Sequence, residues 1–117
     1  MHRTLRDAIA FAEVTTPGAH GCRMRELITD REGAPTFAMR QFAVDPGGHT
    51  PYHSHPWEHE VYILSGKGEV RLKDGPVGIA AGDAVLIAPD EEHSFVNTGS
   101  EVLTFLCLIP VSRGCCR

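Results

Sequence analysis

The sequence predicts an all-β protein, built as an antiparallel sandwich or a small barrel. Three observations favour this class. Short runs rich in β-branched and aromatic residues recur roughly every ten residues. Twelve glycines and eight prolines stand between these runs and indicate many turns. A chain of 117 residues fits one domain, which we expect to span residues 1–117.

The first elements carry the weaker signals. Residues 7–13 predict a helical turn within a short N-terminal arm, and residues 22–30 alternate in part, as a strand does. Residues 31–35 read as a turn. Residues 36–44 predict a strand, which the sequence Asp-Pro-Gly-Gly at 45–48 is expected to close with a turn.

The later elements are clearer. Residues 50–55 are extended, and residues 59–65 are rich in β-branched and aromatic side chains. Residues 69–73 place Val70 and Leu72 on one face and charged side chains on the other, as in a half-exposed strand. Further strands are expected at 77–80, 83–88, 93–97 and 101–111. The interior of such a barrel is a natural pocket, because inward side chains alternate with outward ones.

One stretch of eight residues, "HSHPWEHE" at 53–60, concentrates three histidines and two glutamates. His53 and His55 are two residues apart and point to the same face if this segment is extended. His59 shares a face with Val61 in the following strand. If that face is inward, a third imidazole joins the first two. His93 begins a later strand, and a closed barrel can bring it opposite the others.

The two glutamates admit other interpretations. Glu58 and Glu60 lie two residues apart with His59 between them, so they are candidates for an acid–base pair. Either carboxylate could instead accept the free ring N–H of a metal-bound histidine. Solvated carboxylates that flank a site are the simpler interpretation. Trp57 is expected at the barrel mouth or in a subunit interface.

Two motifs in this order resemble the cupin superfamily. The first motif, G-x5-H-x-H-x3,4-E-x6-G, is matched by Gly47, His53, His55 and Gly66. The second, G-x5-P-x-G-x2-H-x3-N, is matched by Gly82, Pro89, His93 and Asn97, with one extra residue before the proline and one fewer after it. The resemblance implies a cupin jelly-roll β-barrel, also described as a double-stranded β-helix, as a single domain.

The sequence departs from the cupin pattern at two places. His59 stands where the first motif has its glutamate, although Glu60 is one residue further on. Strand parity and the count to Gly66 favour His59. The chain then resembles small single-domain cupins with four histidine ligands, which here are His53, His55, His59 and His93. The glycine of the second motif is missing, because the chain reads Pro-Asp-Glu at 89–91.

The resemblance implies one divalent metal ion, with manganese as the first choice. Imidazole ligands by themselves suit iron, copper, nickel or zinc at least as well. Four neutral imidazoles leave the +2 charge uncancelled, which favours an anionic ligand at the open positions. We expect metal loss as the pH falls through about 6, since the ligands must be unprotonated.

Pocket residues are expected on the strands that flank the histidines. Arg40 shares a face with Phe42 and is either a buried guanidinium that reaches an anionic substrate or a solvent-facing arginine. The resemblance places the face of Phe105, Cys107 and Ile109 toward the metal. Arg40 and Cys107 are the candidates for a catalytic role, and a thiol at 107 would be open to oxidation. The full expected lining is Arg40, Phe42, Val61, Phe105, Cys107 and Ile109.

Three classes of function fit these residues. The first is a metal-dependent dioxygenase or related oxidative enzyme that acts on a small anionic, aromatic or enolisable compound. The second is a binding or sensing module without turnover, and the third is a metal-dependent isomerase. A net charge of −4 with 11 Lys and Arg argues against nucleic-acid binding.

The remaining expectations concern membrane association, location in the cell, the C-terminal tail and the oligomeric state. No apolar run approaches the ~18 residues of a membrane-spanning helix, and the first residues make a poor signal peptide. Cysteines at 22, 107, 115 and 116 do not resemble a disulfide framework, so a cytoplasmic protein is expected. The tail at 112–117 is expected to be disordered. The resemblance implies a homodimer.

Overall fold

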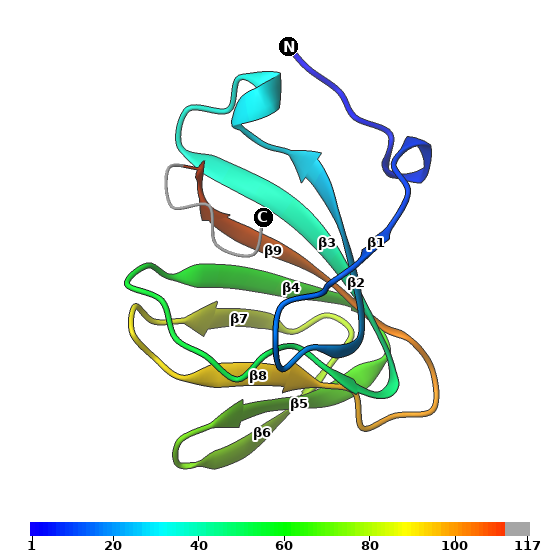
Figure 1. Ribbon diagram of the computed structural model, residues 1–117, viewed down its shortest axis with the longest axis vertical. Coiled ribbons are helices and arrows are strands. Elements are labelled where there is room, and N and C mark those ends of the chain that lie inside the picture. The colour runs from blue at the N-terminus through cyan, green and yellow to red at the C-terminus, as the bar shows by residue number, and fades with distance from the viewer. Residues whose placement is uncertain (112–117) are drawn as a thin grey trace.

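The computed structural model describes residues 1–111. Within them the chain forms nine strands and two short 3₁₀ helices (Figure 1). The predicted disordered tail at 112–117, with Cys115 and Cys116, lies outside the described residues. The elements are η1 (Arg6–Ala8), β1 (Ala12–Glu13), β2 (His20–Ile28), η2 (Asp30–Glu32), β3 (Phe37–His49), β4 (His59–Ser65), β5 (Lys67–Leu72), β6 (Gly75–Ala80), β7 (Ala84–Ile87), β8 (His93–Val96) and β9 (Leu103–Pro110).

The predicted all-β barrel is confirmed. All strands belong to one curled sheet with the order β6-β5-β8-β3-β9-β4-β7, and β2 pairs with β3 and carries β1 (Figure 1). Every pairing is antiparallel. The sheet curls around its own apolar face, so the interior side chains come from strands that are far apart in sequence.

Strand alternation creates the core. In β9 every second residue is buried, and Phe105 is only 1% exposed. Phe105 pairs with Phe42 on β3 and with Ile63 on β4, and directly opposed residues of antiparallel strands face the same side. The Phe105 ring stacks on Phe42 at 5.2 Å and on Phe95 at 4.8 Å between centroids. This aromatic cluster fills the barrel below the histidines.

The turn expected at 45–48 is wrong, because β3 continues through it to His49. Its first part pairs with β2 and β9, and its last residue pairs with Val96 on β8. The glycines lie in a bulge of the β2–β3 pairing, at the place where the other partner of β3 changes from β9 to β8. Gly47 has a φ of 80°, and a Cβ on Gly48 would lie 2.6 Å from the carbonyl oxygen of His20.

The N-terminal arm differs in part from its predicted helical turn. The helical residues are only Arg6–Ala8, and Ala12 is paired with Met24 at the edge of β2. The Phe11 ring lies 4.1 Å from the Arg25 guanidinium carbon, which holds the arm against the outer side of β2. The expected turn near 31–35 begins as the capped 3₁₀ helix η2.

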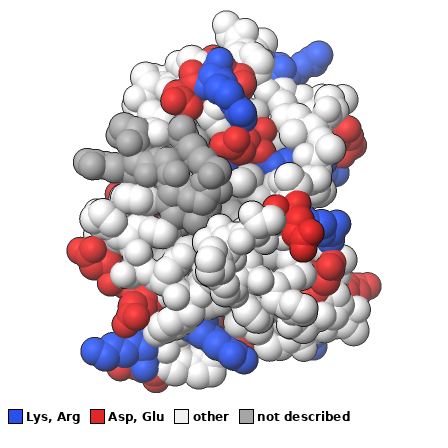
Figure 2. Space-filling model, in the orientation of Figure 1, with Lys and Arg blue, Asp and Glu red and all other residues white. Residues whose placement is uncertain are grey.

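The surface has mixed charge. On the face in Figure 2, Lys and Arg side chains lie beside Asp and Glu side chains and do not gather into a patch. This distribution agrees with the net charge of −4 and offers no basic stripe on that face. Among the described residues, neither short helix has the length or the apolar character needed to cross a bilayer.

Candidate functional site

The structure brings the four predicted histidine rings together inside the barrel. The backbone of His53 forms a bridge with that of His93 through N–O distances of 3.1 and 3.0 Å. The ring centroids of His53 and His55 lie 4.2 Å apart, and those of His53 and His93 lie 5.3 Å apart. His59 lies 5.1 Å from His55 and 5.0 Å from His93. Four imidazoles from two distant chain segments therefore share one site.

Strand parity places His59 inside. His59 begins β4 opposite Ile87 and is 4% exposed, while Glu60, which pairs with Leu108, is exposed on the other face. Glu58 is exposed as well. The two glutamates therefore do not form an acid–base pair in the cavity, and the solvated interpretation of both carboxylates holds.

A tight turn positions two of the other rings. The Glu91 N–H donates to the Ala88 carbonyl oxygen, and Asp90 at the third turn position has a φ of 66°. This is the geometry of a type II turn, where glycine is usual and aspartate is tolerated. The Asp90 N–H donates to the His55 carbonyl oxygen at 2.6 Å. The His93 Nδ1 donates to the Glu91 carbonyl oxygen at 2.8 Å, which leaves the His93 Nε2 unprotonated in the neutral ring.

Burial keeps the imidazoles neutral. Desolvation lowers the pKa of His59 from 6.5 to about 3, with further lowering by the charges of His93 and Arg40. Desolvation also lowers the pKa of His53 to about 4, assisted by His55, His93 and Arg40. The pKa values of His55 and His93 are lowered too, again mainly by burial. At neutral pH the site therefore presents unprotonated nitrogen donors.

Arg40 is buried beside these rings. Its side chain is 1% exposed, its Nη2 donates to the Cys107 Sγ at 3.0 Å, and its guanidinium lies over the Phe42 ring at 5.0 Å. The alternative of a solvent-facing arginine is therefore wrong. The His59 Nδ1 lies 3.2 Å from the same sulfur. If Nδ1 carries the proton and donates to Sγ, the His59 Nε2 is left free to bind a metal.

The donors fit a divalent ion in kind and in proximity. The His59 Nε2 is buried and has no hydrogen-bond partner within residues 1–111. Buried polar atoms are usually paired, so this nitrogen is available to bind a ligand. The Nε2 atoms of His53 and His55 lie 3.1 Å apart and share a hydrogen bond in this structure. The same distance is close to the ~3.0 Å between two imidazole nitrogens that bind one ion at right angles. As they stand, however, no three or more Cys, His, Asp or Glu side chains in the described part could hold a metal. The donors lie together but are not arranged as a finished ligand set.

The cavity at the histidines is small, with a volume of about 30 Å³. Arg40, Phe42, Phe105 and Cys107 line it, as expected from the sequence. Val61 and Ile109 do not line it, although both are on the expected face; they pack in the core instead. Strand parity fixes the face of a residue but not its depth along the barrel.

Four further lining residues were not expected from the sequence, namely Val14, Thr50, Pro51 and Phe95. Phe95 could have been found, because it lies two residues after His93 and shares its face. Thr50 is tied to β8, since its hydroxyl accepts from the Phe95 N–H and its carbonyl oxygen accepts from the Ser94 hydroxyl. Val14 belongs to the N-terminal arm, and no local pattern marks it.

Trp57 stacks on one of the histidines. Its ring lies 4.8 Å from that of His55 between centroids, at an interplanar angle of 7°. This contact fixes the plane of the His55 ring at the mouth of the cavity. The placement agrees with the barrel-mouth alternative for Trp57.

The chain is similar to known proteins in both sequence and structure. A family model described as "Cupin domain" matches residues 40–109. "Protein SchB" from Streptomyces halstedii is 37% identical over 93 residues, which cover 78% of this chain and 67% of the relative. The structure of the polyketide cyclase RemF from Streptomyces resistomycificus is 35% identical, with a TM-score of 0.91 over 97% of this chain and 82% of that one.

A third relative has a different activity. The 1-methylthio-D-xylulose 5-phosphate methylsulfurylase from Rhodospirillum rubrum is 35% identical over 78 residues, which cover 67% of this chain and 50% of that protein. The matched region therefore recurs in proteins with different reactions.

Proposed function

The chain belongs to the cupin domain family, and we propose that it is a metal-dependent enzyme that closes a ring within an enolisable, polyketide-like compound. One observation carries the proposal: three imidazoles, those of His53, His59 and His93, line one largely apolar cavity together with a buried guanidinium, and the His55 ring lies 4.2 Å from that of His53. Such a site favours a substrate that develops negative charge on oxygen during the reaction.

His53, His55, His59 and His93 would hold the ion. Manganese stays the first choice by family resemblance, and iron, copper, nickel and zinc suit the same ligands. When bound, the ion would polarise carbonyl oxygens of the substrate and stabilise negative charge that forms on them.

The side chains around the histidines assign further roles. The Arg40 guanidinium donates hydrogen bonds and is placed to orient an oxyanion in the same cavity. Phe42, Phe95 and Phe105 form the apolar wall that limits water near the reacting atoms. Cys107 accepts from Arg40 and contacts His59, so it fixes both groups relative to each other.

The absence of a strong base narrows the substrate class. Of the described residues that line the cavity, none is a carboxylate, a lysine or a tyrosine. The C–H bond to be broken must therefore be acidic in the substrate itself, as it is between two carbonyl groups. The enolate carbon attacks a second carbonyl carbon of the same molecule and forms a C–C bond. The proton of the broken C–H bond passes to water, and the new alkoxide takes a proton back from water. Loss of one water molecule then completes a reaction without net oxidation.

The relatives support this choice. The two Streptomyces relatives cover most of the chain, and one of them is a polyketide cyclase. Polyketide chains carry carbonyl groups at alternate carbons and are thus rich in acidic C–H bonds. Both the chemistry of the cavity and the similarity lead to the same substrate class.

An oxidative reaction is the second candidate. The same enolate could react with dioxygen, as expected for a dioxygenase, and then the products would contain added oxygen. The buried thiol of Cys107 beside the site argues against a strong oxidant there, because it would be consumed. A binding module would retain the compound unchanged, and an isomerase would return a product of equal mass.

The test uses protein loaded with Mn²⁺ and the probe nonane-2,4,6,8-tetraone. A cyclase yields a product lighter by one water without oxygen uptake, and EDTA abolishes its formation. His59→Gln and Arg40→Met are expected to lower the rate at least tenfold. Glu60→Gln, next to His59 but outward-facing, serves as the matched control. Oxygen uptake would support the dioxygenase, and unchanged probe at all metal loadings would refute catalysis on this class.

We further propose that two copies pair, as the family resemblance implies. Tyr62 and Leu86 are 47% and 65% exposed on the outer side of β4 and β7, where a partner could cover them. Light scattering on the purified protein measures the mass directly. A mass of one chain at micromolar concentration would refute the pairing.

A further inference from the structure

The cavity at the histidines is too small for the substrate class proposed above. Its volume of about 30 Å³ holds roughly two waters. Sites for whole small molecules generally span about 300–1,000 Å³. Only the reacting end of an elongated substrate fits beside the histidines, so the rest must lie elsewhere.

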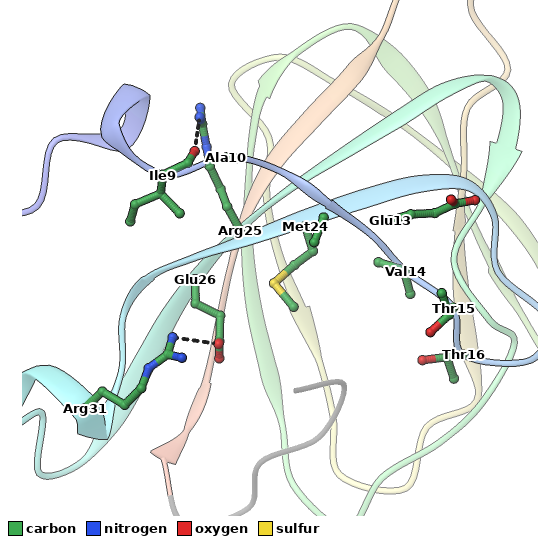
Figure 3. A pocket seen from close by; sticks show the side chains of 11 residues that line it. Ile9, Ala10, Glu13, Val14, Thr15, Thr16, Met24, Arg25, Glu26 and Arg31 are labelled. Carbon is green, nitrogen blue, oxygen red and sulfur yellow. Dashed lines mark hydrogen bonds and ion pairs between the residues drawn. The ribbon is translucent and has the colours of Figure 1, made fainter.

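A groove of about 390 Å³ adjoins this cavity, between the N-terminal arm and β2 (Figure 3). Val14 lines both the groove and the histidine cavity. Met24, in the groove, pairs with Phe42, in the cavity. Directly opposed residues of antiparallel strands share a face, so the part of the groove that Met24 lines lies on the concave side of the sheet, as the cavity does, whereas Glu13 and Arg25 line the groove from the other face.

A second cross-strand pair extends this continuity. Glu26 lines the groove and pairs with Arg40, which lines the cavity. Figure 3 shows the Met24 and Glu26 side chains directed to one side of β2 and the Arg25 side chain directed to the other. Val14 is thus the residue that the groove and the cavity share.

The chemistry of the groove suits an uncharged chain with carbonyl groups. Ala12, Val14 and Met24 provide apolar surface, and Thr15 and Thr16 provide hydroxyl donors. Two acidic side chains, Glu13 and Glu26, and two basic ones, Arg25 and Arg31, line the groove, so its formal charges cancel. The Arg31 Nη2 is ion-paired with the Glu26 carboxylate at 2.8 Å. Such a groove can contact the apolar carbons of a substrate and donate hydrogen bonds to its carbonyl oxygens. It carries no net formal charge that would favour a charged ligand instead.

We propose that the groove between β1 and β2 binds the distal part of an elongated, enolisable substrate whose reacting end lies at the histidines. The inference rests on the proposed function for the identity of the reacting end. It adds a specificity-determining site, because it predicts that chain length beyond the reacting carbonyls governs affinity.

The experiment compares two probes with the same enolisable head, pentane-2,4-dione and undecane-2,4-dione. Both are titrated calorimetrically into Mn²⁺-loaded protein with oxygen excluded. The long probe is expected to bind at least tenfold more tightly than the short one. Ala12→Trp fills the groove and is expected to abolish this advantage while the short probe still binds.

Ser100→Trp is the matched control, because Ser100 is exposed and lines a separate surface groove of about 260 Å³. It is expected to keep the full length dependence. Equal affinities for both probes, or an unchanged advantage in Ala12→Trp, would overturn the inference and leave the proposed function standing. Failure of both probes to bind the unmodified protein would refute the inference and the proposed function together. If Ala12→Trp loses both probes, Thr16→Trp in the same groove decides by the same criterion.

Discussion

Acidification is expected to destabilise the metal-free protein well before its carboxylates are protonated. His59 is neutral when folded, with a pKa of about 3, whereas its reference value is 6.5. Between these values the unfolded chain binds a proton that the folded protein does not. Stability is therefore fully present above pH 6.5 and declines as the pH falls toward 3.

The size of the effect follows from these two values. Each pKa unit corresponds to about 1.4 kcal/mol, so the His59 term reduces the free energy of unfolding by about 2 kcal/mol between pH 7.5 and pH 5. His53, with a pKa of about 4, acts in the same direction, but its ring is partly exposed and solvent screening reduces its share. The total loss in this window is thus expected to be at least that of His59.

Urea unfolding of EDTA-treated protein, followed by the fluorescence of the single tryptophan, measures this loss. In His59→Gln the decrease between pH 7.5 and pH 5 should be smaller by about 2 kcal/mol. His2→Gln, at an exposed position of the N-terminus, should leave the decrease unchanged. The same pH dependence in His59→Gln and in the unmodified protein would show that the ring is not held neutral by burial.

The other predictions concern metal retention and stability. Mn²⁺ is expected to stay bound down to about pH 5, below the value near 6 expected for ordinary imidazoles, because burial weakens proton competition; elemental analysis after dialysis at each pH checks this. Gly68→Ala should cost about 2–3 kcal/mol, since its Cβ would overlap a carbonyl oxygen of β8, whereas Gly78→Ala, with open space around it, should stay within about 0.5 kcal/mol. Asp90→Val should cost about 1–2 kcal/mol at its left-handed backbone position and Asp90→Gly much less, as thermal unfolding would show. Cys107→Ala removes an acceptor of the buried Arg40 and should cost about 1–3 kcal/mol, with partial recovery in Cys107→Ser.

The sequence correctly predicted the features that depend on the alternation of side chains between the two faces of a strand. His59 is inside and Glu60 outside because successive strand residues face opposite sides, which two adjacent positions are enough to reveal. The same rule placed Arg40 and Phe42 on one face. The rule could not predict that Arg40 is only 1% exposed. The burial of a side chain depends on which other strands the curled sheet brings against it.

The errors arose where tertiary pairing overrides a local signal. Asp-Pro-Gly-Gly at 45–48 is a strong turn sequence, yet β3 passes through it because β2, β9 and β8 supply partners on both sides. Val14 and the groove beside it depend on where the N-terminal arm settles, and that is decided by contacts with β2. No pattern within the arm carries this information.

The bridge between His53 and His93 also has a consequence for biosynthesis. These residues are separated by 40 positions, and β4 to β7 lie between them in the chain. A nascent chain still held by the ribosome before residue 93 has emerged lacks one quarter of the donor set. If the four histidines hold an ion as proposed, the complete ligand set forms only when His93 on β8 has joined the segment that carries His53, His55 and His59.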